Sequence, residues 1–256
     1  MLDKINIKDI VAIAKEAGDV IMQIYSQDFE VEYKQDNSPL TLADKKANDI
    51  IENSLNQLSV DLPILSEEGK DIPYEERKHW EYFWLVDPLD GTKEFVKKNG
   101  EFTVNIALIH KDTPVLGVVY APALDICYWA KQGEGAFKDG QRIPLKTESQ
   151  RETYKIVVSR SHMSDETQAF ISDIDTDKEK ELISIGSSLK ICLVAEGEAD
   201  IYPRLGSTME WDTGAAHAIA NEAGKILQKY KDGVYSKHKY NKKYLLNSFF
   251  VVSEAN

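Results

Sequence analysis

The sequence predicts an α+β fold with two lobes, an N-terminal α+β lobe over residues 1–150 and a C-terminal α/β lobe over residues 151–256. Three patterns predict it: apolar residues recur at helical spacing near the start, alternate residues are apolar over 101–130, and strand and helix patterns alternate beyond 153. With 256 residues, 42% of them hydrophobic, the chain can bury a substantial core as one large domain or as two small lobes that share a cleft.

The N-terminal lobe begins with two amphipathic helices. Over residues 7–24, Ile10, Ala17 and Ile21 fall on one helical face. A second helix is predicted to begin at Thr41, and this start places Asp44 in the first helical turn.

An antiparallel sheet should follow. An apolar strand leads to Asp87, and Pro88, which has no backbone N–H, is expected to end it. The tetrad 138–141, Lys-Asp-Gly-Gln, predicts a hairpin. Period-two strands are predicted over 102–108, 115–120 and 126–130.

The C-terminal lobe should begin after the polar stretch 147–153. Helices are predicted near Ser187 and Asp212, with Gly224 ending the second of them. The charged run 173–181 is expected to be a solvated loop. Strands are predicted over 155–159, 182–185, 199–202 and 249–252.

The formal net charge of −12 argues against a nucleic-acid polymer as partner, because that binding needs Lys and Arg to neutralise phosphates. The apolar runs fall far short of the roughly 20 residues that span a bilayer, and the first residues lack the pattern of a secretory signal. We therefore expect a cytoplasmic protein without an integral membrane segment. Cys127 and Cys192 lie in apolar stretches, which favours buried, reduced thiols.

Acidic residues occur where elements are predicted to end or begin. Asp87 and Asp90 follow an apolar strand, Glu67 follows another short apolar run, and Asp212 lies at a helix start. Such oxygen ligands suit Mg²⁺, whereas the five scattered histidines give no zinc-like cluster. The sequence therefore predicts a shared metal site.

Four segments, in this order along the chain, resemble the motif set of the inositol monophosphatase superfamily. The segments are Leu40-Thr41-Leu42-Ala43-Asp44, Ser66-Glu67-Glu68, Asp87-Pro88-Leu89-Asp90-Gly91-Thr92 and Trp211-Asp212-Thr213-Gly214-Ala215. Longer strings are similar to the CysQ-type 3′(2′),5′-bisphosphate nucleotidases: Leu65 to Glu68, Trp84 to Phe95 and Gly186-Ser187-Ser188-Leu189-Lys190. The resemblance covers nearly the whole chain and implies a layered αβαβα sandwich.

The resemblance also implies two or three Mg²⁺ ions. Glu67, Asp87 and the backbone carbonyl of Leu89 would hold one ion, and Asp87, Asp90 and Asp212 would hold a second. A third, weaker ion would lie beside Glu67, which the resemblance also counts among the catalytic residues.

A metal-activated water is the nucleophile that the resemblance implies, held by Thr92 and Asp44. From the residues alone, Asp44 could equally cap its helix and Thr92 could be an N-cap. Gly91 and Thr92 would also present a helix start to the substrate phosphate.

The substrate pocket is expected mainly in the second lobe. Backbone N–H groups at the predicted helix start, the Ser187 hydroxyl and Lys190 could hold a second phosphate. The resemblance adds His162 and Arg204 to this pocket, and it counts Asp212 among the substrate-binding residues.

We therefore expect Mg²⁺-dependent hydrolysis of the 3′-phosphate of adenosine 3′,5′-bisphosphate to AMP and phosphate. The resemblance further implies action on the sulfated relative of that nucleotide, a link to sulfur assimilation and inhibition by Li⁺. It leaves room for a homodimer and for peripheral association with the inner membrane. The rival predictions are an inositol monophosphate or fructose bisphosphate phosphatase and an inactive nucleotide or metal sensor.

Overall fold

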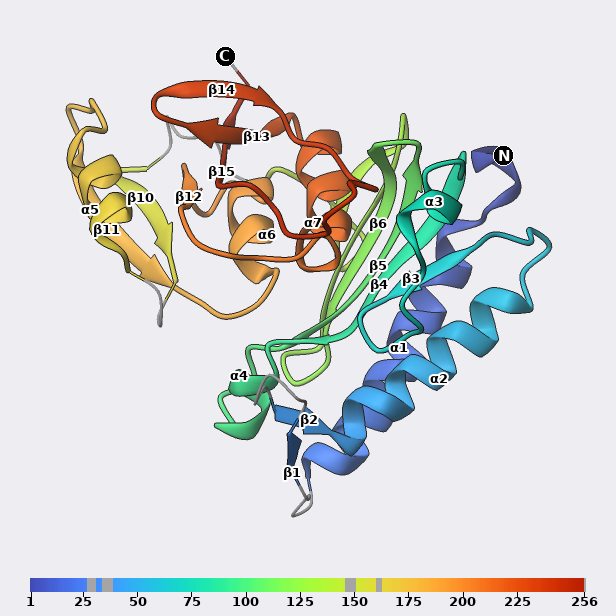
Figure 1. Cartoon of the computed structure of the whole chain (residues 1–256). Coiled ribbons are helices and arrows are strands. Elements are labelled where there is room, and N and C mark those ends of the chain that lie inside the picture. Colours follow the sequence, from blue (N-terminus) through green and yellow to red (C-terminus); the bar gives the residue numbers. More distant parts are fainter. Residues whose placement is uncertain (27–30, 34–38, 146–150, 160–162, 256) are drawn as a thin grey trace.

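A seven-stranded sheet forms the centre of the structure, and helices cover both of its faces (Figure 1). The structure is a computed structural model that describes residues 1–26, 31–33, 39–145, 151–159 and 163–255. On one face lie α1 (Ile7–Tyr25) and α2 (Leu42–Asn56), and on the other lie α6 (Leu189–Ala195) and α7 (Trp211–Glu222). Smaller sheets and α5 (Asp165–Ser172) lie beyond α6 and α7, which gives the αβαβα order of layers that was predicted.

The central sheet contains the strands that the period-two pattern predicted, together with strands that this pattern did not predict. Its order is β3-β4-β5-β6-β7-β8-β9, antiparallel throughout except for the parallel pair β3 and β4. The strands are β3 (Ile64–Ser66), β4 (Tyr82–Asp90), β5 (Thr103–His110), β6 (Thr113–Ala121), β7 (Ile126–Lys131), β8 (Gly135–Lys138) and β9 (Gln141–Ile143).

The side chains of β4 supply both faces of this sheet. Phe83 and Leu85 belong to the core under α6 and α7, whereas Trp84 and Val86 belong to the core under α1 and α2. This alternation follows from the two-residue period of a strand. A strand buried on both faces is apolar at every position, which is why Tyr82–Val86 shows no polar alternation.

The predicted helices and hairpin are confirmed. In α1, Ile10, Ala17 and Ile21 of the predicted face are fully buried, and the side chain of Asn6 caps the first turn. The hairpin between β8 and β9 turns at Asp139 and Gly140, which both have positive φ, as a type I′ turn requires.

One glycine lets α7 approach the sheet. A Cβ placed on Gly117 of β6 would lie 2.1 Å from the backbone oxygen of Ala215 in α7. Any side chain at this position would therefore push α7 away from the sheet, and with it the first turn that carries Asp212.

The strand β4 does not end at Pro88, as we expected from the sequence. Asp87 pairs with Asn105 and Asp90 pairs with Thr103, so three steps along β4 match two steps along β5. The additional residue forms a bulge around Pro88. Proline lacks only the donor of its own ladder bond, and a bulge accommodates that loss.

The strands of the C-terminal half pair mostly in antiparallel fashion, although the alternation of strand and helix patterns indicated an α/β arrangement. Among the described strands of this half, β10 (Thr153–Val158) and β11 (Glu179–Ser184) form the parallel pair. The other strands form an antiparallel sheet in the order β12-β15-β13-β14, with β12 (Tyr202–Arg204), β13 (Lys225–Lys231), β14 (Val234–Lys237) and β15 (Phe250–Glu254).

Three details of the second half differ from the sequence predictions. Residues 179–181 belong to β11 rather than to a solvated loop, although their side chains are largely exposed. The strand predicted over 199–202 begins only at Tyr202, because Ile201 forms no more than an isolated bridge with Ile156. Helix α5 and strands β13 and β14 were not predicted.

The remaining short elements lie at the edges of the layers. They are η1 (Leu2–Lys4), β1 (Val31–Tyr33), β2 (Pro39–Thr41), α3 (Tyr74–Arg77) and α4 (Thr92–Val96). Cys127 and Cys192 are buried and form no disulfide, as predicted. Within the described ranges, no helix combines the length and the apolar character needed to cross a bilayer.

Candidate metal centre and adjoining cavity

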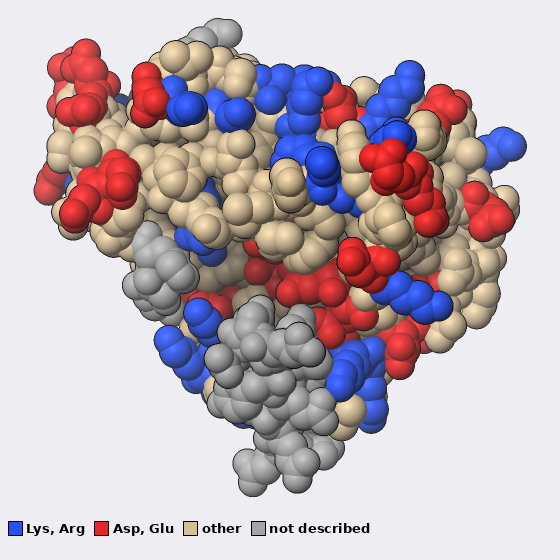
Figure 2. All heavy atoms as spheres, in the orientation of Figure 1, with Lys and Arg blue, Asp and Glu red and all other residues tan. Residues whose placement is uncertain are grey.

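Carboxylates from three elements converge at one end of the central sheet. Glu67 directly follows β3, Asp87 lies in β4, and Asp212 lies in the first turn of α7. One oxygen from each of these three side chains lies within 4.8 Å of the other two. Figure 2 shows Asp and Glu side chains gathered in a hollow at the centre of the molecule, with Lys and Arg on either side.

The bulge in β4 explains how Asp87 and Asp90 reach the same site. In a regular strand, residues three apart point to opposite faces, but one additional residue returns the second of them to the face of the first. The N–H of Leu89 donates to Oδ1 of Asp87 at 3.1 Å, which holds the bulge closed. Gly91 follows with φ of 93°, a left-handed conformation that favours glycine.

Backbone pairing places Glu67 beside the same strand. Its N–H donates to the carbonyl oxygen of Val86 at 3.1 Å, so the parallel pairing of β3 with β4 continues to the point where the acids begin. The metal ligands that the sequence predicted thus come from adjacent strands and from a helix packed on them.

Burial and mutual repulsion raise the pKa of the clustered acids. For Asp87 and Asp212 the pKa lies well above the ordinary range, first because burial disfavours the charged form and then because the other carboxylates repel it. The pKa of Asp90 is also raised by burial, although nearby Lys190 and the hydroxyl of Ser188 oppose the increase. Oxygen donors with excess negative charge fit a hard divalent cation, so this cluster could bind a metal.

Asp90 differs from the other acids in its contacts. It is not in the group of three whose oxygens lie within 4.8 Å of one another. Its Oδ2 accepts a hydrogen bond from Oγ of Ser188 at 3.0 Å and lies 3.5 Å from Nδ2 of Asn105.

Asp44 and Thr92 lie beside the acids. Asp44 is buried in the first turn of α2, as predicted, and its charge contributes to the raised pKa of Asp87. Thr92 is the first residue of α4, and Gly91 occupies the N-cap position, so the alternative of Thr92 as an N-cap is wrong. The hydroxyl of Thr92 donates to the carbonyl oxygen of Leu89 at 3.5 Å.

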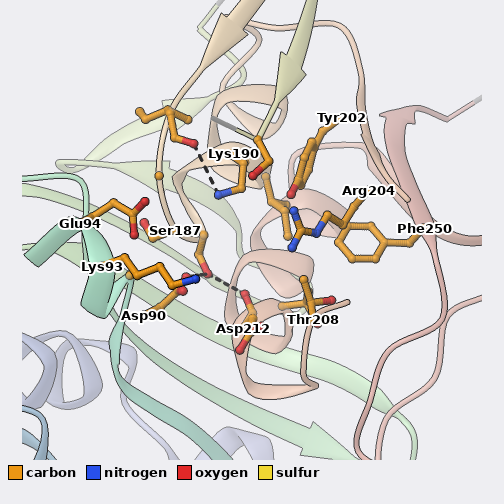
Figure 3. Close-up of a pocket in the computed structure, with 17 residues that line it drawn as sticks. Asp90, Lys93, Glu94, Ser187, Lys190, Tyr202, Arg204, Thr208, Asp212 and Phe250 are labelled. Carbon is orange, nitrogen blue, oxygen red and sulfur yellow. Dashed lines mark hydrogen bonds between the residues drawn. The ribbon is translucent and has the colours of Figure 1, made fainter. Parts of the chain in front are cut away.

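A cavity of about 160 Å³ adjoins the acids. In Figure 3, Lys190 and Arg204 line its upper part and Asp90 and Asp212 line its lower part. Gly91 and Ser187 also line it, so five of the predicted substrate-binding residues border one space, namely Gly91, Ser187, Lys190, Arg204 and Asp212, whereas Thr92 is not among its lining residues. His162 lies outside the described residues.

Lys190 and Arg204 donate to backbone carbonyl oxygens and lie near carboxylates of the site. Lys190 Nζ donates to the carbonyl oxygen of Ile185 at 3.5 Å, and burial lowers the pKa of Lys190. Arg204 donates through Nη2 to the carbonyl oxygen of Ser207 at 2.8 Å. The hydroxyl of Ser187, which has φ of 49°, is buried without a hydrogen-bond partner in the described chain.

The sequence reasoning did not assign Ser188, Asn105 or Tyr202 to the site. Ser188 and Asn105 contact Asp90, and Tyr202 lines the cavity beside Arg204. A signal existed for Asn105, because it is a polar residue within an apolar strand. In the structure it pairs directly with Asp87. Ser188 lies in the segment 186–190 between Ser187 and Lys190, and its residue type alone gives no signal of a role in the site.

The fold and the acid cluster define the class of protein. A family model described as "Inositol monophosphatase family" matches residues 3–255, and the chain belongs to this family. Among its relatives is the protein of Salmonella typhimurium called 3′(2′),5′-bisphosphate nucleotidase CysQ, 51% identical over 222 residues that cover 85% of this chain and 88% of the relative.

Two further comparisons extend over nearly the whole chain. The protein of Buchnera aphidicola with the same name is 44% identical and covers 99% of this chain, which covers 93% of it. A crystal structure described as CysQ from Bacteroides thetaiotaomicron, a bacterial member of the inositol monophosphatase family, has a TM-score of 0.87 and 44% sequence identity. That match covers 98% of this chain and 97% of the other.

Proposed function

We propose that this protein hydrolyses the 3′-phosphate of adenosine 3′,5′-bisphosphate to AMP and inorganic phosphate. The observation that carries the proposal is the high identity, over most of the chain, to proteins called 3′(2′),5′-bisphosphate nucleotidase. The positions of the acid cluster and the cationic cavity support it, because they offer one region for a reacting phosphate and a second for another phosphate. Action on the sulfated nucleotide, a role in sulfur assimilation and inhibition by Li⁺ belong to the same proposal.

Two Mg²⁺ ions fit the proposal, with room for a third beside Glu67. Glu67, Asp87 and the carbonyl of Leu89 would hold one ion, and Asp87, Asp90 and Asp212 would hold the other. When bound, Mg²⁺ neutralises charge on the phosphate and lowers the pKa of a coordinated water.

Asp44 and Thr92 handle the proton of the attacking water in this proposal. Asp44 is buried near Asp87, where its carboxylate is placed to accept the proton of the water. The Thr92 hydroxyl, directed to the Leu89 carbonyl, can orient the water toward the phosphorus while Asp44 accepts the proton. The hydrolysis then needs no covalent intermediate on the protein.

Lys190 and Arg204 are proposed to hold the second phosphate. Arg donates to phosphate in a planar, bidentate manner, whereas Lys acts as a point charge, so the two are complementary. The unpartnered Ser187 hydroxyl in the cavity adds a donor. A substrate with a single phosphate leaves these groups unsatisfied, and we therefore expect weaker binding of inositol monophosphate.

Phosphate release from adenosine 3′,5′-bisphosphate, AMP and inositol 1-phosphate tests the proposal. Each is measured with Mg²⁺, with EDTA, and with Mg²⁺ plus Li⁺. We expect Mg²⁺-dependent release from the bisphosphate, suppressed by Li⁺. Preference for inositol 1-phosphate would favour the sugar-phosphatase alternative, to which the family match lends support, and binding without hydrolysis would favour a sensor.

Four properties remain predictions: the division at residue 150, a cytoplasmic location, a homodimer and peripheral association with the inner membrane. Limited proteolysis around residue 150, cell fractionation and light scattering of the purified protein test them. Cleavage that yields two stable fragments would support the division into lobes.

A further inference from the structure

The hydroxyl of Ser188 lies where four elements of the site meet. Ser188 is 3% exposed and directly precedes α6. Its Oγ is 3.0 Å from Oδ2 of Asp90 in β4, 2.6 Å from the backbone oxygen of Asp212 in α7 and 2.9 Å from Nδ2 of Asn105 in β5. One small side chain thus joins segments that are distant in the sequence.

This hydroxyl does not serve the helix that follows it. A serine at an N-cap ordinarily accepts a hydrogen bond from a backbone N–H in the first turn. Ser188 occupies the N-cap of α6, whose residues are all described, and forms no such bond. Its hydrogen-bonding capacity is directed to the carboxylate site instead.

The chemistry of the donors and acceptors fixes the direction of the hydrogen bonds at Oγ of Ser188. The amide nitrogen of Asn105 can only donate, so Oγ of Ser188 accepts from it. The single hydroxyl hydrogen is then shared between the Asp212 carbonyl and the Asp90 carboxylate, which are both acceptors. Asn105 therefore orients Ser188, and Ser188 links the two acidic residues.

We propose that Ser188, oriented by Asn105, is a positioning residue that fixes Asp90 relative to the first turn of α7. It thereby sets the separation between Asp90 and Asp212, the two carboxylates assigned above to a shared Mg²⁺. The proposal rests on the metal site of the proposed function. Outer partners of metal ligands typically change metal affinity or activity by about 10- to 100-fold when they are removed.

The same residue connects the carboxylates to the cavity. Ser187 and Lys190, proposed to hold the second phosphate, lie one residue before and two residues after Ser188 in the sequence. A shift of this segment would move the phosphate clamp relative to Asp90. Ser188 therefore holds the residues proposed to bind the second phosphate at a fixed position relative to the carboxylates proposed to bind Mg²⁺.

Calorimetric titration of the full-length protein with Mg²⁺, without substrate, tests the proposal. For Ser188→Ala we expect the Kd of Mg²⁺ to rise by about tenfold or more. We expect the same direction for Asn105→Ala, and for the double variant an increase smaller than the product of the two, because both act through one contact. The matched control is Thr167→Val in α5, which removes another buried hydroxyl, one that is bonded to the N-cap residue Ser164.

The outcomes separate this proposal from the proposed function. A folded Ser188→Ala variant whose Kd for Mg²⁺ stays within about twofold of the wild-type value overturns the positioning role. If Ser188→Ala lowers the melting temperature in EDTA but leaves Mg²⁺ binding unchanged, Ser188 has a structural role only, and this result also overturns the positioning role. Failure of the wild type to hydrolyse the bisphosphate rejects the proposed function but leaves the Mg²⁺ titration valid, and failure of the wild type to bind Mg²⁺ rejects both.

Discussion

Arg77 and Asn241, which are 164 positions apart, exchange hydrogen bonds in both directions. Nη1 of Arg77 donates to Oδ1 of Asn241 at 3.0 Å, and Nδ2 of Asn241 donates to the carbonyl oxygen of Arg77 at 2.7 Å. The N–H of Asn241 in turn donates to Oε2 of Glu210 at 2.6 Å. Glu210 precedes Asp212 by two residues in the sequence. This partly buried chain of contacts connects α3 to the segment that leads into α7.

Replacement of Arg77 by Ala should therefore destabilise the whole fold. Arg77 is 3% exposed and also donates to the carbonyl oxygens of Lys242 and Lys243, which would lose their partner. We expect the free energy of unfolding to fall by roughly 2 to 4 kcal/mol, measured by urea denaturation. Arg142→Ala, at an exposed arginine, is the control, and equal effects of the two substitutions would contradict the prediction.

The layered fold could be predicted from the sequence because its elements have clear periods. Helix α1 has a continuous apolar stripe, and β5 to β7 lie between turn-forming residues. Strand β11 could not be predicted in full, since its residues 179–181 are charged and its strand conformation depends on backbone pairing with β10. Pairing between distant segments leaves little trace in local composition.

The same distinction holds within the site. Glu67, Asp87 and Asp212 could be predicted to converge because carboxylates at element ends are visible in the sequence. The bulge that orients Asp90 depends on pairing with β5, and the role of Ser188 depends on contacts with Asn105 and Asp212. Those contacts are tertiary, so the residue types alone do not indicate them.

Asp87→Asn should abolish hydrolysis and stabilise the metal-free protein. Asp87 is proposed to contact both Mg²⁺ ions, so we expect turnover to fall by more than about 100-fold. Its raised pKa shows that its charge is unfavourable in the metal-free fold, chiefly because of burial and then because of Glu67. The melting temperature in EDTA at neutral pH should therefore increase, and that in saturating Mg²⁺ should not.

Calorimetry and phosphate release check these two effects separately. Near-normal turnover in the folded variant would reject Asp87 as a metal ligand. A lower melting temperature in EDTA would contradict the proposed repulsion among the acids.

His217 should make the protein sensitive to mild acid. Burial lowers the pKa of His217 from 6.5 to about 3, and its Nδ1 lies 2.9 Å from the hydroxyl of Tyr240. At pH values between these two pKa values, the unfolded chain binds a proton at His217 and the folded chain does not. The free energy of unfolding therefore decreases as the pH falls below about 6.5. From pH 7 to pH 5 this single group should remove about 2 kcal/mol from the free energy of unfolding.

Urea denaturation of the wild type and His217→Gln at both pH values, in EDTA, measures the contribution. The variant should lose about 2 kcal/mol less than the wild type over this interval. His238, whose pKa burial lowers to about 4, remains in both proteins and cancels in the difference. Equal losses would show that His217 does not titrate as described.

Lys190→Ala should weaken binding of the bisphosphate more than it slows its hydrolysis. The ammonium group of Lys190 lines the cavity with Arg204, whereas the Thr92 hydroxyl lies toward the Leu89 carbonyl beside the acids. Loss of one charge-assisted hydrogen bond is worth about 1.5 to 3 kcal/mol, so we expect KM to rise about tenfold or more. Steady-state kinetics on adenosine 3′,5′-bisphosphate in saturating Mg²⁺ measure KM and kcat.

A single-phosphate substrate and a distant lysine provide the controls for Lys190. A nucleoside 3′-monophosphate has no second phosphate for Lys190, Arg204 and Ser187 to hold, so this second clamp makes no contact with it. Lys190→Ala should therefore change the KM of this substrate much less. Lys180→Ala removes a lysine whose Nζ donates to backbone oxygens of Ile171 and Ser172 near the end of α5, and it should leave both constants unchanged. If Lys190→Ala lowers kcat equally for both substrates and leaves KM unchanged, Lys190 acts at the reacting phosphate through its nearby partner Asp90, and the second clamp must be sought in Arg204 and Ser187.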